Sequence, residues 1–263
     1  MRHAITLPPA GRLAQPRLLV EVAQAAEAGG WDAVFLWDHV LRPDVNEMLD
    51  PWIVMSAMAA ATERIRVGPM VTPLIRRRLI KLAREVMTLD LLSAGRLTLG
   101  LGLGVDTGGE LSRFGEVVDP VTRGAMLDEG ADALAALLAG ERVRLDGAHY
   151  RVDDVVLEPR SVQSPRPPIW CAARGDAQRP VRRAARFEGL FPLDVDSDRL
   201  RRMLDTVALS RGNLDGYDVC MQVEPGRGAP EWMPDEVTWV VQGYPVTVEP
   251  HQLLEDLATG PRG

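Results

Sequence analysis

One stretch decides the fold: Ala33-Val34-Phe35-Leu36-Trp37-Asp38-His39. Its first five residues are apolar without interruption, which is typical of a strand buried on both faces of a parallel sheet. The helical pattern before it, residues 16–29, ends at a glycine pair that favours a helix C-cap. A helix followed by a buried strand indicates a βα repeat, and the polar pair Asp38-His39 then marks the C-terminal end of this strand.

The same alternation of short apolar runs and helical periods recurs along the chain. We expect eight strands, at residues 3–7, 33–37, 65–71, 96–102, 169–172, 189–193, 217–223 and 237–242. Helices are expected at residues 16–29, 51–62, 78–93, 120–138, 176–187 and 197–211. The 263 residues, 46% of them hydrophobic, can bury one large core. We therefore predict a single-domain TIM (β/α)8 barrel over residues 1–263.

Two segments interrupt this rhythm. Residues 142–158 predict a small hairpin excursion after the fourth helix, with its turn at Asp146-Gly147. The link at residues 224–236 is rich in proline and glycine, so no regular helix is expected between strands seven and eight. The outer ring of helices should be incomplete around a complete inner barrel.

Composition excludes several classes of protein. The net charge is −7, and the only basic run, Arg76-Arg77-Arg78, is typical of a solvated face, so a nucleic-acid-binding surface is not expected. The apolar stretch before Pro8 is too short for a secretory signal, and residues 51–61 are too short to span a bilayer. We expect a cytoplasmic protein that does not enter a membrane.

Cysteine and histidine usage gives no indication of a metal. Cys171 and Cys220 match neither a redox pair nor a zinc spacing, and are expected to be buried thiols. The four histidines are scattered, so no metal site is predicted.

Chemistry in such a barrel gathers at the C-terminal ends of the strands. Asp38 and His39 are the candidate catalytic residues there, since an imidazole can donate or accept a proton near neutral pH. From residue type alone a second interpretation stays open, in which Asp38 caps a turn and His39 packs at the barrel rim.

Two further turns are candidates for ligand contact. Gly102-Leu103-Gly104 lets a flat ring or a phosphate approach the backbone, although glycine turns after strands are common. It matches no dinucleotide-binding fingerprint. The turn Ala173-Arg174-Gly175-Asp176 precedes a helix expected near residue 177, so it predicts a phosphate pocket, or else a plain loop with Asp176 as N-cap.

Several segments resemble the bacterial luciferase-like monooxygenase family. They are residues 26–39, 60–68, 88–97 with 100–102, 123–129, 146–150 and 168–170. The resemblance covers nearly the whole chain. It implies a TIM barrel that holds FMN or the deazaflavin F420 at its mouth, usually as a homodimer, and that carries out flavin-peroxide oxygenation or deazaflavin hydride transfer on a small organic substrate.

The resemblance also assigns residues. It places Asp38 and His39 beside the cofactor ring, with His39 as a hydrogen-bond donor or proton shuttle on the substrate side. Met70-Val71-Thr72 would back the ring, Gly102-Leu103-Gly104-Val105 would lie beside it, and Ala172-Ala173-Arg174-Gly175-Asp176 would receive the phosphate. The mouth should then be a concavity bordered by His39, Thr72 and Gly175.

Departures from the family pattern affect the reaction. Leu103 stands where FMN members carry a phosphate-binding arginine, which favours F420. Val105 stands where F420-dependent sugar-phosphate dehydrogenases carry a glutamate, so their acid chemistry does not transfer. Ala172-Ala173 replaces a common glycine pair. The alternatives are an FMN-dependent monooxygenase supplied by a separate flavin reductase, and a non-catalytic flavin-binding barrel.

Overall fold

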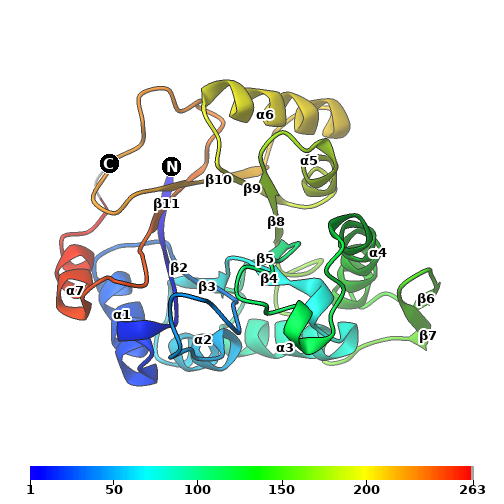
Figure 1. The fold of residues 1–263 in the computed structure, drawn as a ribbon, viewed down its shortest axis with the longest axis horizontal. Helices are drawn as coiled ribbons and strands as arrows, with labels where there is room; N and C mark the ends of the chain where they lie inside the picture. Colours follow the sequence, from blue (N-terminus) through cyan, green and yellow to red (C-terminus); the bar gives the residue numbers. More distant parts are fainter. Residues whose placement is uncertain (262–263) are drawn as a thin grey trace.

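A computed structural model describes residues 1–261 and contains a parallel barrel with helices around it (Figure 1). The sheet order is β3-β2-β1-β11-β10-β9-β8-β5-β4. Its strands are β1 (Arg2–Leu7), β2 (Ala33–Leu36), β3 (Arg66–Pro69), β4 (Thr72–Pro73), β5 (Leu99–Gly102), β8 (Ile169–Arg174), β9 (Gly189–Leu193), β10 (Asp218–Val223) and β11 (Trp239–Gly243). The predicted TIM-barrel architecture is confirmed.

The outer layer consists mainly of α-helices. These are α1 (Pro16–Ala28), α2 (Pro51–Ala60), α3 (Leu79–Leu92), α4 (Pro120–Leu138), α5 (Gln178–Ala184), α6 (Ser197–Arg211) and α7 (Pro250–Ala258), with short 3₁₀ turns η1 (Gly11–Leu13), η2 (Leu74–Arg76) and η3 (Ser112–Phe114). The sequence prediction omitted α7. Between β10 and β11 the described chain forms turns and no helix. No helix among residues 1–261 is long and apolar enough to cross a membrane.

The third barrel strand differs from its prediction. Residues 65–71 were expected to be continuous, but the strand is divided into β3 and β4, with a cis peptide between Met70 and Val71. β3 pairs with β2 on one side, and β4 pairs with β5 on the other. The two segments together occupy one position in the ring, so the predicted count of eight barrel strands holds.

Two glycines allow the ring to close between β3 and β5. The Val67 N–H donates to the carbonyl of Arg96 (3.1 Å), and the Thr98 N–H donates to the carbonyl of Val67 (3.0 Å). A Cβ on Gly68 would lie 1.9 Å from the Thr98 carbonyl oxygen, and one on Gly100 would lie 2.3 Å from that of Pro69. Only a residue without a side chain permits this approach of two backbones.

The core has two layers. A large cluster fills the space between strands and helices, and a second cluster lies inside the barrel around Phe35, Trp170 and Trp239. The rings of Phe35 and Trp170 have centroids 5.6 Å apart, and those of Trp170 and Trp239 are 5.2 Å apart. These aromatic rings fill the barrel interior, so the barrel is a packed core and leaves only its ends for ligands.

A hairpin of β6 (Val143–Asp146) and β7 (Arg151–Val155) projects beyond α4 (Figure 1). Its loop spans residues 147–150, longer than the two-residue turn expected at Asp146-Gly147. The Glu129 carboxylate of α4 accepts the N–H groups of Ala148, His149 and Tyr150 at 2.7–3.1 Å. This carboxylate belongs to α4 and fixes the conformation of the loop. Local turn propensity therefore did not predict the length of the loop.

Gly68→Ala should destabilise the protein by about 2–3 kcal/mol, because the new methyl group overlaps a backbone oxygen that cannot move without opening the barrel. Urea unfolding measures the effect. Gly124→Ala in α4 is the matched control, since its Cβ would meet side-chain atoms no closer than 3.5 Å. The control should be neutral or stabilising by up to about 1 kcal/mol. Equal effects of the two substitutions would contradict this account of closure.

Candidate functional site

Asp38 forms the centre of a buried polar network at the C-terminal end of β2. Its carboxylate accepts hydrogen bonds from Thr72 Oγ1 (2.7 Å) and Trp52 Nε1 (3.2 Å). It also pairs with Arg76 (2.6 Å) and Arg77 (3.0 Å), and the Asp38 side chain has no exposed surface. All of these donors come from neighbouring elements, so Asp38 joins the end of β2 to α2, β4 and the segment before α3.

Glu110 connects His39 to this network. One carboxylate oxygen lies 2.8 Å from His39 Nδ1, and the other accepts the Val40 N–H (3.1 Å) and an Arg76 N–H (2.8 Å). Arg76 also donates to the backbone carbonyl of Asp38 (2.8 Å). The side chains are 1% exposed for Glu110 and 24% for His39. His39 is therefore bound to Glu110 through Nδ1 on its buried side, and it keeps a solvent-accessible edge.

The environment of Glu110 favours its ionised form. Burial raises the pKa of the Glu110 carboxyl, but the hydrogen bond and charge of His39, the Val40 N–H and Arg76 together outweigh burial and lower that pKa below its usual value. Glu110 is therefore a carboxylate at neutral pH. It acts as an acceptor towards all three of its partners.

The arginine run has a different role from the one predicted. Arg76 and Arg77 were expected on a solvated face, but their side chains are only 8% and 15% exposed. Arg77 also pairs with Glu85 of α3 (3.3 Å). Arg78 is exposed, as expected. The prediction failed because the acids that draw in the first two arginines lie 34–39 residues away in sequence.

The predicted ring-binding residues converge at the same end of the barrel. Val71 lies against Gly102, whose Cβ would come within 2.3 Å of a Val71 methyl group and 3.9 Å of the Ala172 Cβ. Met70, Val71 and Ala172 belong to or pack against the interior cluster. Thr6, which lies on the same face of β1 as the inward-facing Ala4, has a buried hydroxyl with no hydrogen-bond partner among the described residues. Small apolar surfaces and one unsatisfied hydroxyl fit the edge of a flat heteroaromatic ring.

The predicted phosphate turn differs in detail. Ala173 and Arg174 belong to β8, and α5 begins at Gln178, one residue after the expected start near residue 177. Its N-cap is Ala177, so the alternative assignment of Asp176 as N-cap is wrong; Asp176 instead pairs with Arg199 (3.0 Å). Arg174 pairs with Asp194 at 2.5 Å. Gly175 has a φ of +65° and open space around it.

The turn after β5 lies close to the network. Arg123 of α4 donates to the carbonyl of Gly104 (2.9 Å), while Leu103 is partly buried and Val105 is exposed. Asp106 accepts the N–H groups of Leu111 and Ser112 (2.8 and 3.0 Å), which fixes the loop that carries Glu110.

Glu110 and Arg76 were not identified from sequence as site residues. The available signal was weak: Glu110 follows two glycines in the loop after a barrel strand, where functional groups gather. Nothing in the sequence paired it with His39, which lies 71 positions earlier.

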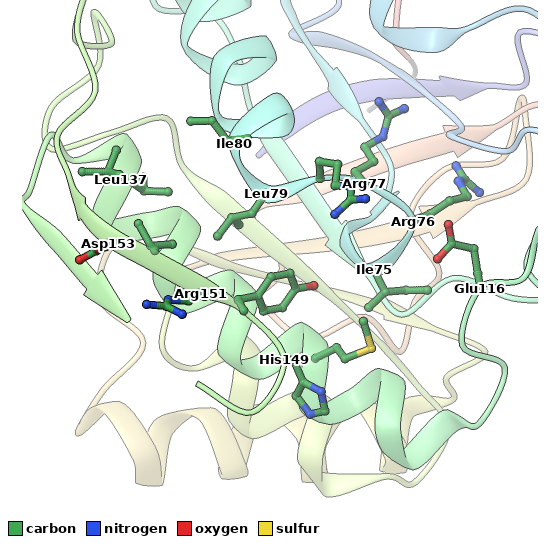
Figure 2. A pocket seen from close by; sticks show the side chains of 15 residues that line it. Ile75, Arg76, Arg77, Leu79, Ile80, Glu116, Leu137, His149, Arg151 and Asp153 are labelled. Carbon is green, nitrogen blue, oxygen red and sulfur yellow. The ribbon is translucent and has the colours of Figure 1, made fainter. Parts of the chain in front are cut away.

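The cavities do not coincide with the expected concavity. One of about 590 Å³ lies outside the barrel between α3, α4 and the hairpin, and His39, Thr72 and Gly175 do not line it. Figure 2 shows Leu79 and Leu137 on one side of it, and His149 and Arg151 on the hairpin side. A second hollow of about 600 Å³ lies between loops 41–46 and 106–113, which follow β2 and β5. Its lining includes Gly109, the neighbour of Glu110 in the chain, but neither His39 nor Glu110.

Cys171 and Cys220 are buried free thiols, as predicted. Burial raises the pKa of Cys171 to about 12 and that of Cys220 well above its usual value. Neither thiol is a nucleophile at neutral pH. Among residues 1–261 no group of three or more His, Cys, Asp or Glu side chains has metal-binding geometry.

The family model of the luciferase-like monooxygenases matches residues 2–224. The chain belongs to the luciferase-like monooxygenase family. An uncharacterised family relative from Mycobacterium tuberculosis is 33% identical over 230 residues, which cover 84% of this chain and 77% of that one. An F420-dependent glucose-6-phosphate dehydrogenase of Microbacterium testaceum is 33% identical over 222 residues, covering 80% of this chain and 64% of that enzyme.

A solved structure supports the same luciferase-like fold. The F420-dependent tetrahydromethanopterin reductase of Methanopyrus kandleri superposes with a TM-score of 0.75 at 17% identity. The match covers 98% of this chain and 97% of that one. At this identity the likeness establishes the barrel fold alone.

Asp38→Ala should cost about 3–5 kcal/mol of folding free energy, because it leaves two arginines in a buried position without their carboxylate. Chemical denaturation measures this loss. Asp44→Ala, which breaks an exposed pair with Arg42 at 2.7 Å, is the control and should leave the unfolding midpoint within error. A mild effect of Asp38→Ala would show that the network contributes little to stability.

Glu110 should make a pH-dependent contribution to stability. Its folded-state pKa is lowered, so the contribution is fully present above the ordinary value of 4.5 and is lost as the pH falls through the folded-state value. The difference in unfolding free energy between the wild type and Glu110→Gln should therefore shrink below about pH 4.5. Denaturant titrations at pH 7, 5 and 3.5 test this, and a constant difference would contradict it.

Proposed function

We propose that this luciferase-like protein is an F420-dependent oxidoreductase that transfers hydride to or from a small organic substrate. The observation that carries the proposal is the His39–Glu110 pair, which Arg76 holds at the C-terminal end of the barrel. A partly exposed imidazole against a buried carboxylate is suited to proton transfer. Family membership supplies the reaction class.

The residues at the mouth fit the ring of such a cofactor. We propose that Met70, Val71 and Thr72 back the ring, that Gly102 to Val105 lie beside it, and that Ala172 to Asp176 receive the phosphate. A bound deazaflavin would supply the two-electron hydride donor or acceptor. His39 would take up the substrate's hydroxyl proton when a C–H bond gives up its hydride, and return it in the reverse direction.

Asp38 would contribute by anchoring the site. Its carboxylate is fully buried and is occupied by Thr72, Trp52 and the two arginines, so it is not placed to contact a substrate. We propose that it fixes the backbone that presents His39.

Two observations favour F420 over FMN. Leu103 stands in the strand turn where FMN members carry arginine, and a curated relative at 33% identity is F420-dependent. That relative's substrate does not transfer, since this chain has Val105 in place of the glutamate and spans 64% of the enzyme.

Two other functions have support. The family's monooxygenase chemistry favours an FMN-dependent oxygenase supplied by a separate flavin reductase. The engagement of Arg174 by Asp194 favours a non-catalytic flavin-binding barrel with a weakened phosphate site. We further propose a cytoplasmic homodimer formed by single-domain subunits.

Titration of the protein with F420, FMN and reduced FMN, followed by fluorescence and calorimetry, separates these functions. We expect F420 to bind most tightly. Tighter binding of reduced FMN, with oxygen consumption, would support the monooxygenase. Binding without turnover across a panel of alcohols and enones would support the non-catalytic barrel, and absence of binding would reject the proposal.

His39→Ala should lower turnover by about 10²–10⁴-fold, the usual contribution of a proton-transfer group, while the fold is retained. The partly exposed position explains the small expected change in stability. His149→Ala, on the hairpin loop, is the control and should leave turnover unchanged. Rates measured with the bound cofactor test this, and an unchanged rate for His39→Ala would remove His39 from the reaction.

A further inference from the structure

The carboxylate of Glu110 is held in one orientation by donors of different kinds. One oxygen accepts both the Val40 N–H (3.1 Å) and an Arg76 N–H (2.8 Å), while the other faces His39 Nδ1 at 2.8 Å. Arg76 is itself fixed by the carboxylate and carbonyl of Asp38. Rotation of the Glu110 carboxylate would break all three of these hydrogen bonds in a buried position, so the plane of the carboxylate is fixed and one oxygen always faces His39.

This arrangement determines which nitrogen of His39 carries the proton. An ionised carboxylate can only accept, so the facing Nδ1 must donate. In neutral imidazole the remaining Nε2 then carries a lone pair. Within residues 1–261, Nε2 has no hydrogen-bond partner. Free histidine prefers the opposite tautomer, with the proton on Nε2, so the protein must supply the interaction that reverses this preference.

We propose that Glu110 is a positioning residue that locks His39 in the Nδ1–H tautomer, so that Nε2 is the proton-accepting atom at the barrel mouth. The proposal rests on the proposed function for its catalytic meaning, but the tautomer itself is a property of the protein without any ligand. Arg76 contributes by keeping the Glu110 carboxylate in place.

Other charged groups around His39 are accounted for. Asp38, Glu110 and Glu85 form ion pairs with Arg76 and Arg77. Lys81, which pairs with Glu85 at 2.7 Å, supplies the third positive charge, so these charges are compensated. Asp44 is exposed and paired with Arg42. Trp37 packs against the imidazole edge to face, with ring centroids 6.3 Å apart, and offers no hydrogen bond in that geometry. Glu110 is therefore the group that selects the tautomer.

Glu110→Gln should reverse the tautomer. The amide oxygen will be directed at the two donors, Val40 N–H and Arg76, because an NH₂ group there would face two other donors. The NH₂ group then faces His39 Nδ1, which must accept. The proton is thereby moved to Nε2, and His39 can no longer accept a proton at the mouth.

Two-dimensional ¹H–¹⁵N NMR of the imidazole nitrogens in the ligand-free protein tests this directly. The chain has four histidines, and the His39 signals are assigned by their loss in His39→Ala. We expect the Nδ1–H pattern in the wild type above pH 7.5 and the Nε2–H pattern in Glu110→Gln. The wild-type spectrum is decisive even if the variant folds poorly, since an Nε2–H tautomer there would overturn the proposal.

Glu129→Gln is the matched control, because Glu129 also accepts backbone N–H groups but near His149. It should leave the tautomer of His39 unchanged. An unchanged tautomer in Glu110→Gln would also overturn the proposal.

Kinetics separate this inference from the proposed function. With a bound cofactor and a reactive substrate, Glu110→Gln should lower kcat by about 100-fold at unchanged KM. A loss confined to KM would contradict a positioning role. If no cofactor binds but the tautomers behave as expected, the proposed function fails while the tautomer assignment stands.

Discussion

The buried ion network around Asp38 and Arg76 is the interaction on which the site depends. Charged side chains are costly to bury unless they are paired, and the cost of breaking one pair exceeds the gain from forming it. Here two carboxylates in the loops that follow β2 and β5, Asp38 and Glu110, face two consecutive arginines. Because these ion pairs connect the loops that follow β2, β4 and β5, they fix the positions of the three loops relative to one another. The position of His39, in the first of these loops, is fixed in the same way.

The barrel beneath the network explains why these loops meet. The glycines at positions 68 and 100 let β3 and β5 approach closely enough to close the ring, and the aromatic rings of Phe35, Trp170 and Trp239 fill the interior. A closed parallel barrel sends all its carboxyl ends to one face. The packed interior leaves no room for a ligand, so the proposed cofactor would lie above it, beside Val71, Gly102 and Ala172.

The two ends of the proposed cofactor site differ in their electrostatics. At the ring end the charges are buried and mutually paired, which leaves the imidazole of His39 as the accessible polar group. At the phosphate end the pairs are exposed: Arg174 with Asp194, and Asp176 with Arg199 and Arg202. Exposed pairs are weak and exchange partners readily. The ring end is therefore preorganised, whereas an incoming phosphate must compete with the Asp194 carboxylate for Arg174.

The sequence by itself determined the barrel, most of its strands and helices, and the placement of Asp38 and His39 at a strand end. These features follow from local patterns of hydrophobicity and from capping residues such as Asp50, which accepts the N–H groups of Trp52 and Ile53. Only the tertiary structure decided which groups pair. Arg76 and Arg77 turn inward because Asp38 and Glu110 attract them across long sequence separations. Glu110 became part of the site for the same reason: partners brought together by chain folding leave no periodic signal in the sequence.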